Sequence, residues 1–232
     1  MEIETERAIS KIRAMYCEQD LLSQTDGSAS FKQGATRVIA AAYGPVEVRS
    51  NKELLDKSYV EVIFRTKVGL PGCAEKSLEQ VIKKSCEPVI LTSLHPRSAM
   101  TIIVQVVQNS GSLFSCAVNA TCMAMIDAGY PMRCTAASVT CALMDNNEIQ
   151  LDPTLEQEQE ASAVLTFVFD SINQSLLTSS TKGMFTIEQF NQCLSACKEA
   201  SGHIFKFFRQ SVERKLSKDA KYQNINTNPV DT

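Results

Sequence analysis

Residues 95–132 read HPRSAMTIIVQVVQNSGSLFSCAVNATCMAMIDAGYPM, and we expect the rest of the fold to form around them. An extended apolar strand, Met100–Gln108, leads into a small polar turn, and a helix, Leu113–Ile126, starts directly after the turn. The first N–H groups of a helix lack intrahelical acceptors, and the helix dipole is positive at that end. A strand, a Ser/Gly turn and a helix N-terminus in this order therefore predict a place that can hold an anion.

The whole chain has the composition of a globular protein. Its 232 residues suit one large domain or two small ones, and 44% hydrophobic and 21% charged residues are ordinary values. A net charge of −3 provides no global basic field for nucleic acid. The longest apolar runs are far shorter than the roughly 20 residues that cross a bilayer, and the acidic N-terminus lacks the apolar core of a signal peptide. We therefore expect a soluble intracellular protein without a membrane partner.

The nine cysteines and the basic residues follow separate patterns. No CxxC pair occurs, and most cysteines lie within apolar patterns, which predicts reduced, buried thiols. Basic residues gather in 202–221 around an apolar stripe. This stretch is either a solvated helix face or a second nucleic-acid site.

Alternation and turn signals predict the elements on either side of the central stretch. We expect a helix from Ser77 to about residue 94, weakened at Pro88, and a long helix over about 186–218. Residues 154–160 are polar and acidic, and residues 176–181 are polar. The predicted strands are 17–22, 28–33, 36–48, 59–68, 132–144, 148–153 and 161–171. This order predicts an α+β fold with mixed sheets, with a lead-in at 1–14, one domain at 15–218 and a disordered polar tail at 219–232.

Several strings together resemble the RNase PH family, and the resemblance covers about residues 10–218. They are DGSASFKQGATRVIAAAYGPVEV (26–48), LEQVIKKSCEPVI (78–90), the stretch Met100–Gly129 that continues into YPM, and LDPTLEQEQEASAVLTF (151–167). The resemblance implies an RNase PH-like α+β fold whose members pair into dimers and assemble as a six-membered ring with a central pore. In the eukaryotic RNA exosome six different members form this ring, and single-stranded RNA is threaded through it. It also implies a distribution over nucleus, nucleolus and cytoplasm.

The resemblance further implies a phosphate clamp at the predicted anion-binding turn. Active members are phosphorolytic 3′→5′ exoribonucleases in which inorganic phosphate is the co-substrate and a Gly-Gly-Thr-Arg clamp holds it. Here the clamp falls on Ser110, Gly111, Ser112 and Leu113, which predicts the first three as phosphate-binding residues. Leu113 replaces the arginine and so removes a bidentate, permanently charged phosphate ligand.

The acidic residues of the family site match only in part. Family members use two aspartates six residues apart, and these positions hold Glu158 and Val164. Valine cannot donate a proton, although Asp152 and Glu160 lie nearby in the sequence. The resemblance thus makes Glu158, Glu160 and Asp152 the candidate catalytic residues, with weak or absent phosphorolysis.

Four basic residues are the candidate nucleic-acid contacts. By the resemblance, Arg65, Lys67, Lys76 and Arg97 would lie near one RNA path, where Arg and Lys contact phosphates without reading sequence. The alternative is that all four are solvated surface charges.

Three functions remain open on the sequence. The first is an RNA-binding ring subunit of the exosome, partnered by other RNase PH-like subunits, with little or no catalysis. The second is a homodimeric nuclease outside the exosome, acting on RNA or DNA by phosphorolysis or by hydrolysis with Mg²⁺ held by the carboxylates of 152–160. The third is an assembly scaffold that binds no nucleic acid, with residues 152–160 as a solvated acidic loop.

Overall fold

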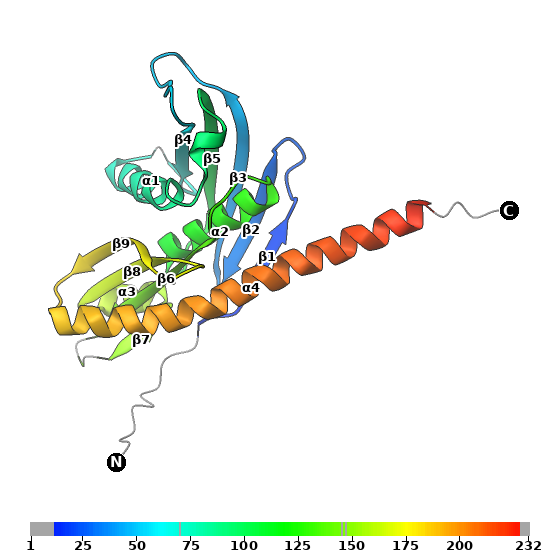
Figure 1. Ribbon diagram of the computed structural model, residues 1–232. Coiled ribbons are helices and arrows are strands. Elements are labelled where there is room, and N and C mark those ends of the chain that lie inside the picture. Colours follow the sequence, from blue (N-terminus) through cyan, green and yellow to red (C-terminus); the bar gives the residue numbers. More distant parts are fainter. Residues whose placement is uncertain (1–11, 70, 145, 147, 228–232) are drawn as a thin grey trace.

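A computed structural model describes residues 12–69, 71–144, 146 and 148–227 of the chain (Figure 1). Nine strands and four α-helices lie within these residues, together with a short 3₁₀ helix at Thr92–Leu94. The strands are β1 Met15–Gln19, β2 Gly27–Gln33, β3 Thr36–Glu47, β4 Tyr59–Arg65, β5 Ser98–Gln108, β6 Ala136–Leu143, β7 Ile149–Leu151, β8 Ala163–Asp170 and β9 Leu176–Gly183. The helices are α1 Cys73–Cys86, α2 Leu113–Asp127, α3 Leu155–Glu160 and α4 Ile187–Thr227.

The strands form two sheets of different topology. The five-stranded sheet has the order β1-β2-β3-β5-β4, and the four-stranded sheet has the order β7-β6-β8-β9. Within the first sheet only β4 and β5 pair in parallel, with Tyr59 opposite Ala99 and Arg65 opposite Gln105. Because parallel neighbours need a crossover connection, α1 lies between them in the chain and packs against β4. The ends of β4 and β5 therefore meet at the same edge of the molecule.

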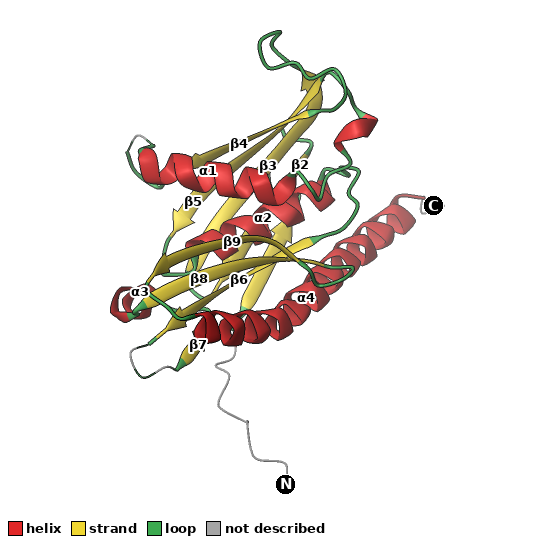
Figure 2. Cartoon of the chain, turned by 60° about the vertical axis from the view of Figure 1, so that its left-hand side comes forward, coloured by secondary structure: helices red, strands yellow, loops and turns green. Residues whose placement is uncertain are grey.

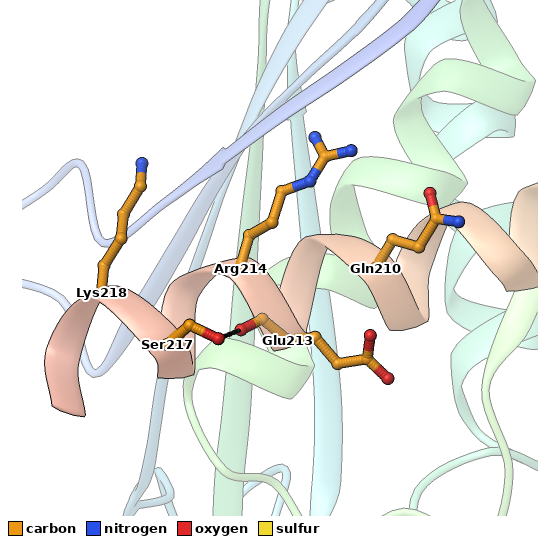
Figure 3. Close-up of a pocket in the computed structure, with 5 residues that line it drawn as sticks. All are labelled: Gln210, Glu213, Arg214, Ser217 and Lys218. Carbon is orange, nitrogen blue, oxygen red and sulfur yellow. Dashed lines mark hydrogen bonds between the residues drawn. The ribbon is translucent and has the colours of Figure 1, made fainter. Parts of the chain in front are cut away.

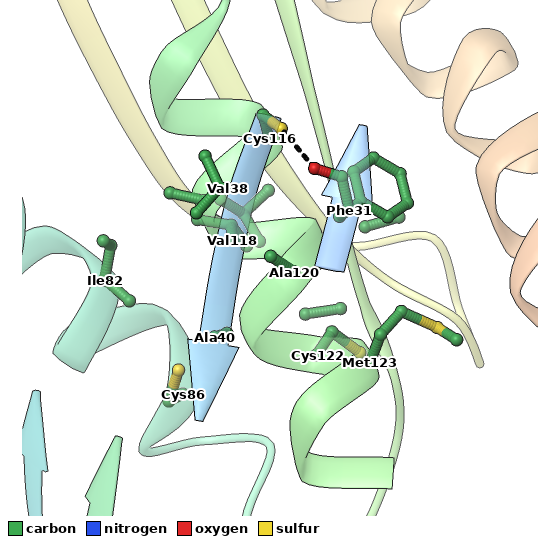
Figure 4. Close-up of a cluster of buried hydrophobic side chains, with 14 of the residues drawn as sticks. Phe31, Val38, Ala40, Ile82, Cys86, Cys116, Val118, Ala120, Cys122 and Met123 are labelled. Atoms are coloured by element: carbon green, nitrogen blue, oxygen red, sulfur yellow. Dashed lines mark hydrogen bonds between the residues drawn. The ribbon is translucent and has the colours of Figure 1, made fainter. Parts of the chain in front are cut away.

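Helix α2 lies between the two sheets and forms the centre of the core (Figure 2). Every residue from Ser115 to Met125 is buried, as expected for a helix of small and apolar residues with no polar face. Its small side chains allow close approach to β2 and β3 (Figure 4), where the Cys116 thiol donates to the Phe31 carbonyl at 3.6 Å. On the other side the Asn119 side chain bonds both the N–H and the carbonyl of Ser138 in β6. The predicted central helix is thus confirmed and joins both sheets.

Helix α4 packs against β6, β8 and β1, and its C-terminal part extends beyond the sheets (Figure 1). Phe207 and Phe208 make edge-to-face contacts with Phe31, which fixes the middle of the helix to β2. The helix continues to Thr227, well into the stretch that the sequence predicted as a disordered tail. Its periodic apolar face ends near Val212, so hydrophobic patterning carried no signal for the last turns.

The start and end of α1 differ from the prediction. The expected cap at Ser77 is wrong, because the helix already begins at Cys73, where the Glu75 carboxylate accepts the N–H of Gly72 at 2.8 Å. The helix ends before Pro88, whose missing N–H and bulky ring prevent a longer helix.

Two elements lie in stretches that the sequence analysis described only as polar. Strand β9 pairs antiparallel with β8 along its whole length, but it is an exposed edge strand, so it shows no apolar alternation. Helix α3 is only six residues long and is fixed by a capping box of Thr154 and Gln157 rather than by an apolar face. Both elements lack the hydrophobic period by which sequence patterns are read.

The cysteines of the described chain are all free thiols. Six of them are buried, and burial raises the pKa of the Cys122 thiol to about 12. The predicted reduced, buried thiols are confirmed at these six positions, whereas Cys73 is exposed. No helix among the described residues combines the length and apolar character needed to cross a membrane.

The contact of β2 with the end of α2 yields a stability prediction. A Cβ added at Gly27 would lie 2.2 Å from the backbone nitrogen of Ala128, so Gly27→Ala must displace main chain. We expect it to lower the free energy of unfolding by about 1–3 kcal/mol, the usual cost of overpacking, measured by urea denaturation.

Gly202→Ala is the matched control for this substitution. Gly202 lies within α4 with no atom near the added Cβ, so alanine should stabilise the protein by about 0.5–1 kcal/mol. Equal stability of the two variants would contradict the predicted packing of β2 against α2.

Candidate functional site

The predicted anion-binding turn lies between the end of β5 and the start of α2. Gly111 has φ of +96°, and a Cβ there would lie 2.5 Å from the Pro153 carbonyl and 2.6 Å from the Leu155 nitrogen. Only glycine fits this backbone without displacing the segment after β7. Ser112 caps α2 in a left-handed conformation, and its hydroxyl donates to the Pro153 carbonyl at 3.0 Å. Residues 153–155 therefore lie directly against the turn.

The three N–H groups of the turn already have acceptors within the protein. The Ser110 N–H donates to the Thr36 hydroxyl at 3.1 Å, and the Gly111 N–H donates to the side-chain oxygen of Asn109 at 3.2 Å. The Ser112 N–H donates to the Glu158 carboxylate at 2.6 Å. A phosphate that binds any of these three N–H groups would have to displace its acceptor, so at these donors the turn is filled rather than open.

The carbonyl groups of the turn are held by Arg13 and Thr36. The Arg13 guanidinium donates to the Ser110 carbonyl at 3.2 Å and to the Gly111 carbonyl at 3.3 Å. The Thr36 hydroxyl donates to the same Gly111 carbonyl at 2.6 Å. Because Arg13 and Thr36 hold the carbonyls of the turn, the N–H of Ser112 points toward α3.

Asp152 is the counterion of Arg13. The guanidinium binds both carboxylate oxygens, at 2.6 and 2.8 Å, and the Arg13 backbone N–H donates to Asp152 at 3.1 Å. The side chain of Asp152 is 1% exposed, so the carboxylate is out of reach of solvent. Of the predicted catalytic residues, Asp152 is thus engaged in a structural ion pair.

Glu158 lies half-buried on α3, and Glu160 is exposed at the end of the same helix. Burial raises the pKa of Glu158, while the Ser112 N–H and the charges of Arg13 and Lys182 oppose this increase. Lys182 is on β9, directly across from Val164 on β8, the position of the second family aspartate. Glu158 is therefore the one predicted catalytic residue that the structure brings to the turn.

The predicted magnesium site finds no support in the geometry. Among the described residues no group of three or more His, Cys, Asp or Glu side chains is placed to hold a metal ion. Asp152 pairs with Arg13, and Glu158 accepts the Ser112 N–H, so these two carboxylates have different partners and do not converge on a metal position.

The four candidate nucleic-acid residues fall into two places. Arg65 ends β4, Lys67 follows it, and Lys76 lies in the first turns of α1. These three lie at the edge where β5 leads into the anion-binding turn, because β4 and β5 are parallel. Arg97 precedes β5 and, at about 3.3 Å per residue, lies on the order of 20 Å from Arg65. The structure thus separates Arg97 from the other three.

The basic stretch of α4 has partners of its own. Lys215 pairs with the buried Asp127 at the end of α2 and so attaches α4 to the central helix. Farther out, a shallow hollow is lined only by α4 (Figure 3), by Gln210, Glu213, Arg214, Ser217 and Lys218. A hollow formed by one helix has no opposing wall, so it does not define a ligand site.

Sequence reasoning missed several residues of the turn. Arg13 lies 139 residues from Asp152, in a stretch predicted as lead-in, and Thr36 and Lys182 lie on other strands. None of them carries a local motif. The role of Asn109 could have been predicted, since the side chain of an Asn before a Ser-Gly turn commonly accepts the backbone N–H two residues on.

Comparison with known families assigns the chain to a class. It matches the description "3′ exoribonuclease family, domain 1" over residues 11–131 and "3′ exoribonuclease family, domain 2" over residues 134–200. The chain therefore belongs to the 3′ exoribonuclease (RNase PH) family, and the resemblance seen in the sequence is confirmed. The predicted RNase PH-like α+β fold is confirmed as well.

Particular relatives cover nearly the whole chain. The "Exosome complex exonuclease RRP46 homolog" of Arabidopsis thaliana is 31% identical, over 94% of this chain and 99% of the relative. The crystal structure of rice (Oryza sativa) Rrp46 superposes with a TM-score of 0.85 at 32% identity, over 90% of this chain and 98% of that one. An Archaeoglobus fulgidus exosome structure shares the fold, with a TM-score of 0.76 at 16% identity, over 85% of this chain and 89% of that one.

The Arg13–Asp152 pair provides a test of the site's framework. Arg13→Met leaves a buried carboxylate without its counterion, and the free energy of unfolding should fall by about 3–5 kcal/mol in urea denaturation. Arg97→Met is the control, since the Arg97–Glu53 pair is largely exposed and 3.6 Å long, and its loss should cost less than about 1 kcal/mol. Similar losses in both variants would contradict the assigned role of Arg13.

Proposed function

We propose that this chain is a ring subunit of an RNA exosome that contacts RNA during 3′→5′ processing and degradation and has little or no phosphorolytic activity. The names and coverage of the RRP46 relatives support the exosome assignment. The observation that carries the catalytic part is the bond of the Ser112 N–H to the chain's own Glu158 carboxylate. Within this proposal the chain works beside other RNase PH-like subunits in nucleus, nucleolus and cytoplasm.

The chemistry of phosphorolysis explains why this observation matters. Attack by inorganic phosphate needs no protein nucleophile, so catalysis depends on holding the phosphate and stabilising its charge. Leu113 offers no charge at the clamp, and Val164 offers no proton at the second acidic position. The Ser112 N–H is the clamp donor at the N-cap of α2, and Glu158 occupies it.

RNA contact is proposed for the edge that holds Arg65, Lys67 and Lys76. The three side chains are exposed and belong to neighbouring elements at the end of β4 and the start of α1. Lys76 also pairs with Glu79 at 2.9 Å, which leaves Arg65 and Lys67 as the stronger candidates for phosphate contact. Such contacts track the RNA backbone without reading its sequence.

A second candidate function is a homodimeric nuclease that acts on RNA or DNA outside the ring. It is favoured by Glu158, because a carboxyl group with a raised pKa is suited to act as a general acid. Glu160 is exposed nearby and accessible to substrate. Dependence of cleavage on added phosphate, on added Mg²⁺, or on neither separates phosphorolysis, hydrolysis and contamination. Sedimentation of the isolated chain tests the homodimer.

The catalytic part of the proposal predicts the outcome of a phosphorolysis assay. Purified chain, incubated with single-stranded RNA and inorganic phosphate, should release nucleoside diphosphates no faster than a blank. Leu113→Arg, Val164→Asp and Glu158→Asp together restore the clamp arginine and both family aspartates, and they shorten the carboxylate that occupies the Ser112 N–H. Release should then rise about a hundredfold above the blank, the low end of what a placed general acid contributes.

Leu216→Arg adds the same charge at an exposed position of α4 and should leave the rate at background. Robust phosphate-dependent release by the unaltered chain would contradict the proposal.

The RNA edge predicts a change in salt dependence. Arg65→Glu and Lys67→Glu together should weaken binding of single-stranded RNA, and each lost phosphate contact should reduce the slope of log K against log salt by about 0.7. Fluorescence anisotropy over a salt series measures both quantities.

Arg97→Glu reverses one charge at the far end of β4 and β5, so the slope of this variant should stay close to that of the unaltered chain. A chain that binds no RNA at any salt concentration would instead support the scaffold function.

A further inference from the structure

The contact between α3 and α2 involves a charged side chain at a position where an anion would sit. Glu158 reaches from α3 to the first turn of α2 and accepts the Ser112 N–H at 2.6 Å. This N–H lies at the positive end of the α2 dipole, where a carboxylate is stabilised. The Ser112 side chain makes no capping bond to the helix, and the Glu158 carboxylate instead accepts the backbone N–H of this N-cap residue.

The backbone around Glu158 is fixed by bonds that do not involve its side chain. Leu155 donates to the Ser110 carbonyl at 3.2 Å, and the Ser112 hydroxyl donates to the Pro153 carbonyl at 3.0 Å. The Arg13–Asp152 pair holds the start of the same segment. Withdrawal of the Glu158 carboxylate therefore requires only rotation of one half-buried side chain.

We propose that Glu158 determines the specificity of this turn: its carboxylate is an intramolecular ligand that excludes tetrahedral oxyanions, such as phosphate or the phosphate group of an RNA, from the Ser112 N–H. This inference rests on the proposed function in one respect, that the turn is an inherited phosphate pocket. It adds that the pocket is occupied by the chain itself and not merely weakened by the loss of the clamp arginine.

The charges around Glu158 would suit an oxyanion once the carboxylate has left. Arg13, next to β1, and Lys182, on β9, both stabilise the ionised carboxylate of Glu158. Both would act in the same sense on a phosphate or sulfate in its place. Asp152 opposes them and lies 2.6 Å from Arg13, so the two charges of this pair largely cancel and Lys182 supplies the net positive charge.

Competition between Glu158 and an oxyanion has a defined pH dependence. Burial raises the pKa of Glu158, and protonation removes the negative charge that holds the side chain on the Ser112 N–H. Sulfate remains a dianion in this range. Sulfate should therefore bind the unaltered chain more tightly as the pH falls through the pKa of Glu158, and this dependence should vanish in Glu158→Gln.

The experiment follows sulfate binding to the full chain by the amide resonance of Ser112 and by calorimetry. Glu158→Ala opens the N–H and removes a like charge, so sulfate should bind at least about tenfold more tightly, a difference of 1.4 kcal/mol, and shift the Ser112 resonance. Glu156→Ala removes an exposed carboxylate from the same helix and should match the unaltered chain.

The same titration separates exclusion from simple helix capping. If Glu158 only caps α2, Glu158→Ala lowers stability but leaves sulfate affinity equal to that of Glu156→Ala, and the proposal is overturned. Should Glu158→Ala fail to fold, the isosteric Glu158→Gln and the pH series on the unaltered chain still decide, since a pH-independent sulfate affinity in the unaltered chain would also overturn it.

Further arms identify the source of the oxyanion. Inorganic phosphate and a short RNA carrying a 3′-phosphate are compared with the same RNA ending in a hydroxyl, each with Glu158→Gln. Sulfate binding involves neither RNA contact nor cleavage, so a failure of the RNA-binding or phosphorolysis predictions leaves this result interpretable. Conversely, the chain can bind RNA through Arg65 and Lys67 even when sulfate affinity is unaffected by Glu158.

Discussion

The ion pair of Arg13 with Asp152 is the interaction on which the geometry of the site depends. It joins the chain before β1 to the segment after β7, and the same guanidinium holds two carbonyls of the turn between β5 and α2. Because Asp152 is almost fully buried, either charge left alone would be costly. The pair thus fixes where the turn, α2 and α3 lie relative to one another.

The central helix explains how much of the fold could be predicted. The apolar strand β5, the turn and α2 were readable because the hydrophobic period of each element matches its surroundings, and a helix of small residues has to be buried on all sides. Edge strand β9 and short helix α3 were not readable, since one faces solvent and the other is held by caps. Their positions follow from pairing with β8 and from the bonds to the turn.

The site was predictable in part of its residues but not in its contacts. The resemblance directed attention to Ser110–Ser112 and to Glu158, which the structure places together. That the Glu158 carboxylate occupies the Ser112 N–H depends on two elements 46 residues apart, and no spacing rule reveals such a bond. Arg97 shows what the sequence alone does not reveal, because basic residues spread along a chain share an edge only when strand direction brings them there.

The presence of this turn is weak evidence that the chain catalyses phosphorolysis. Arg13 and Thr36 hold its carbonyls, and Gly111 is required by the close approach of Pro153, so all three are needed for folding whether or not phosphate binds. The residues that would act only on phosphate, at positions 113 and 164, are apolar here. A turn that is held by core contacts stays in place when phosphorolysis is absent. A carboxylate that reaches the start of α2 can then accept a backbone N–H that no phosphate occupies.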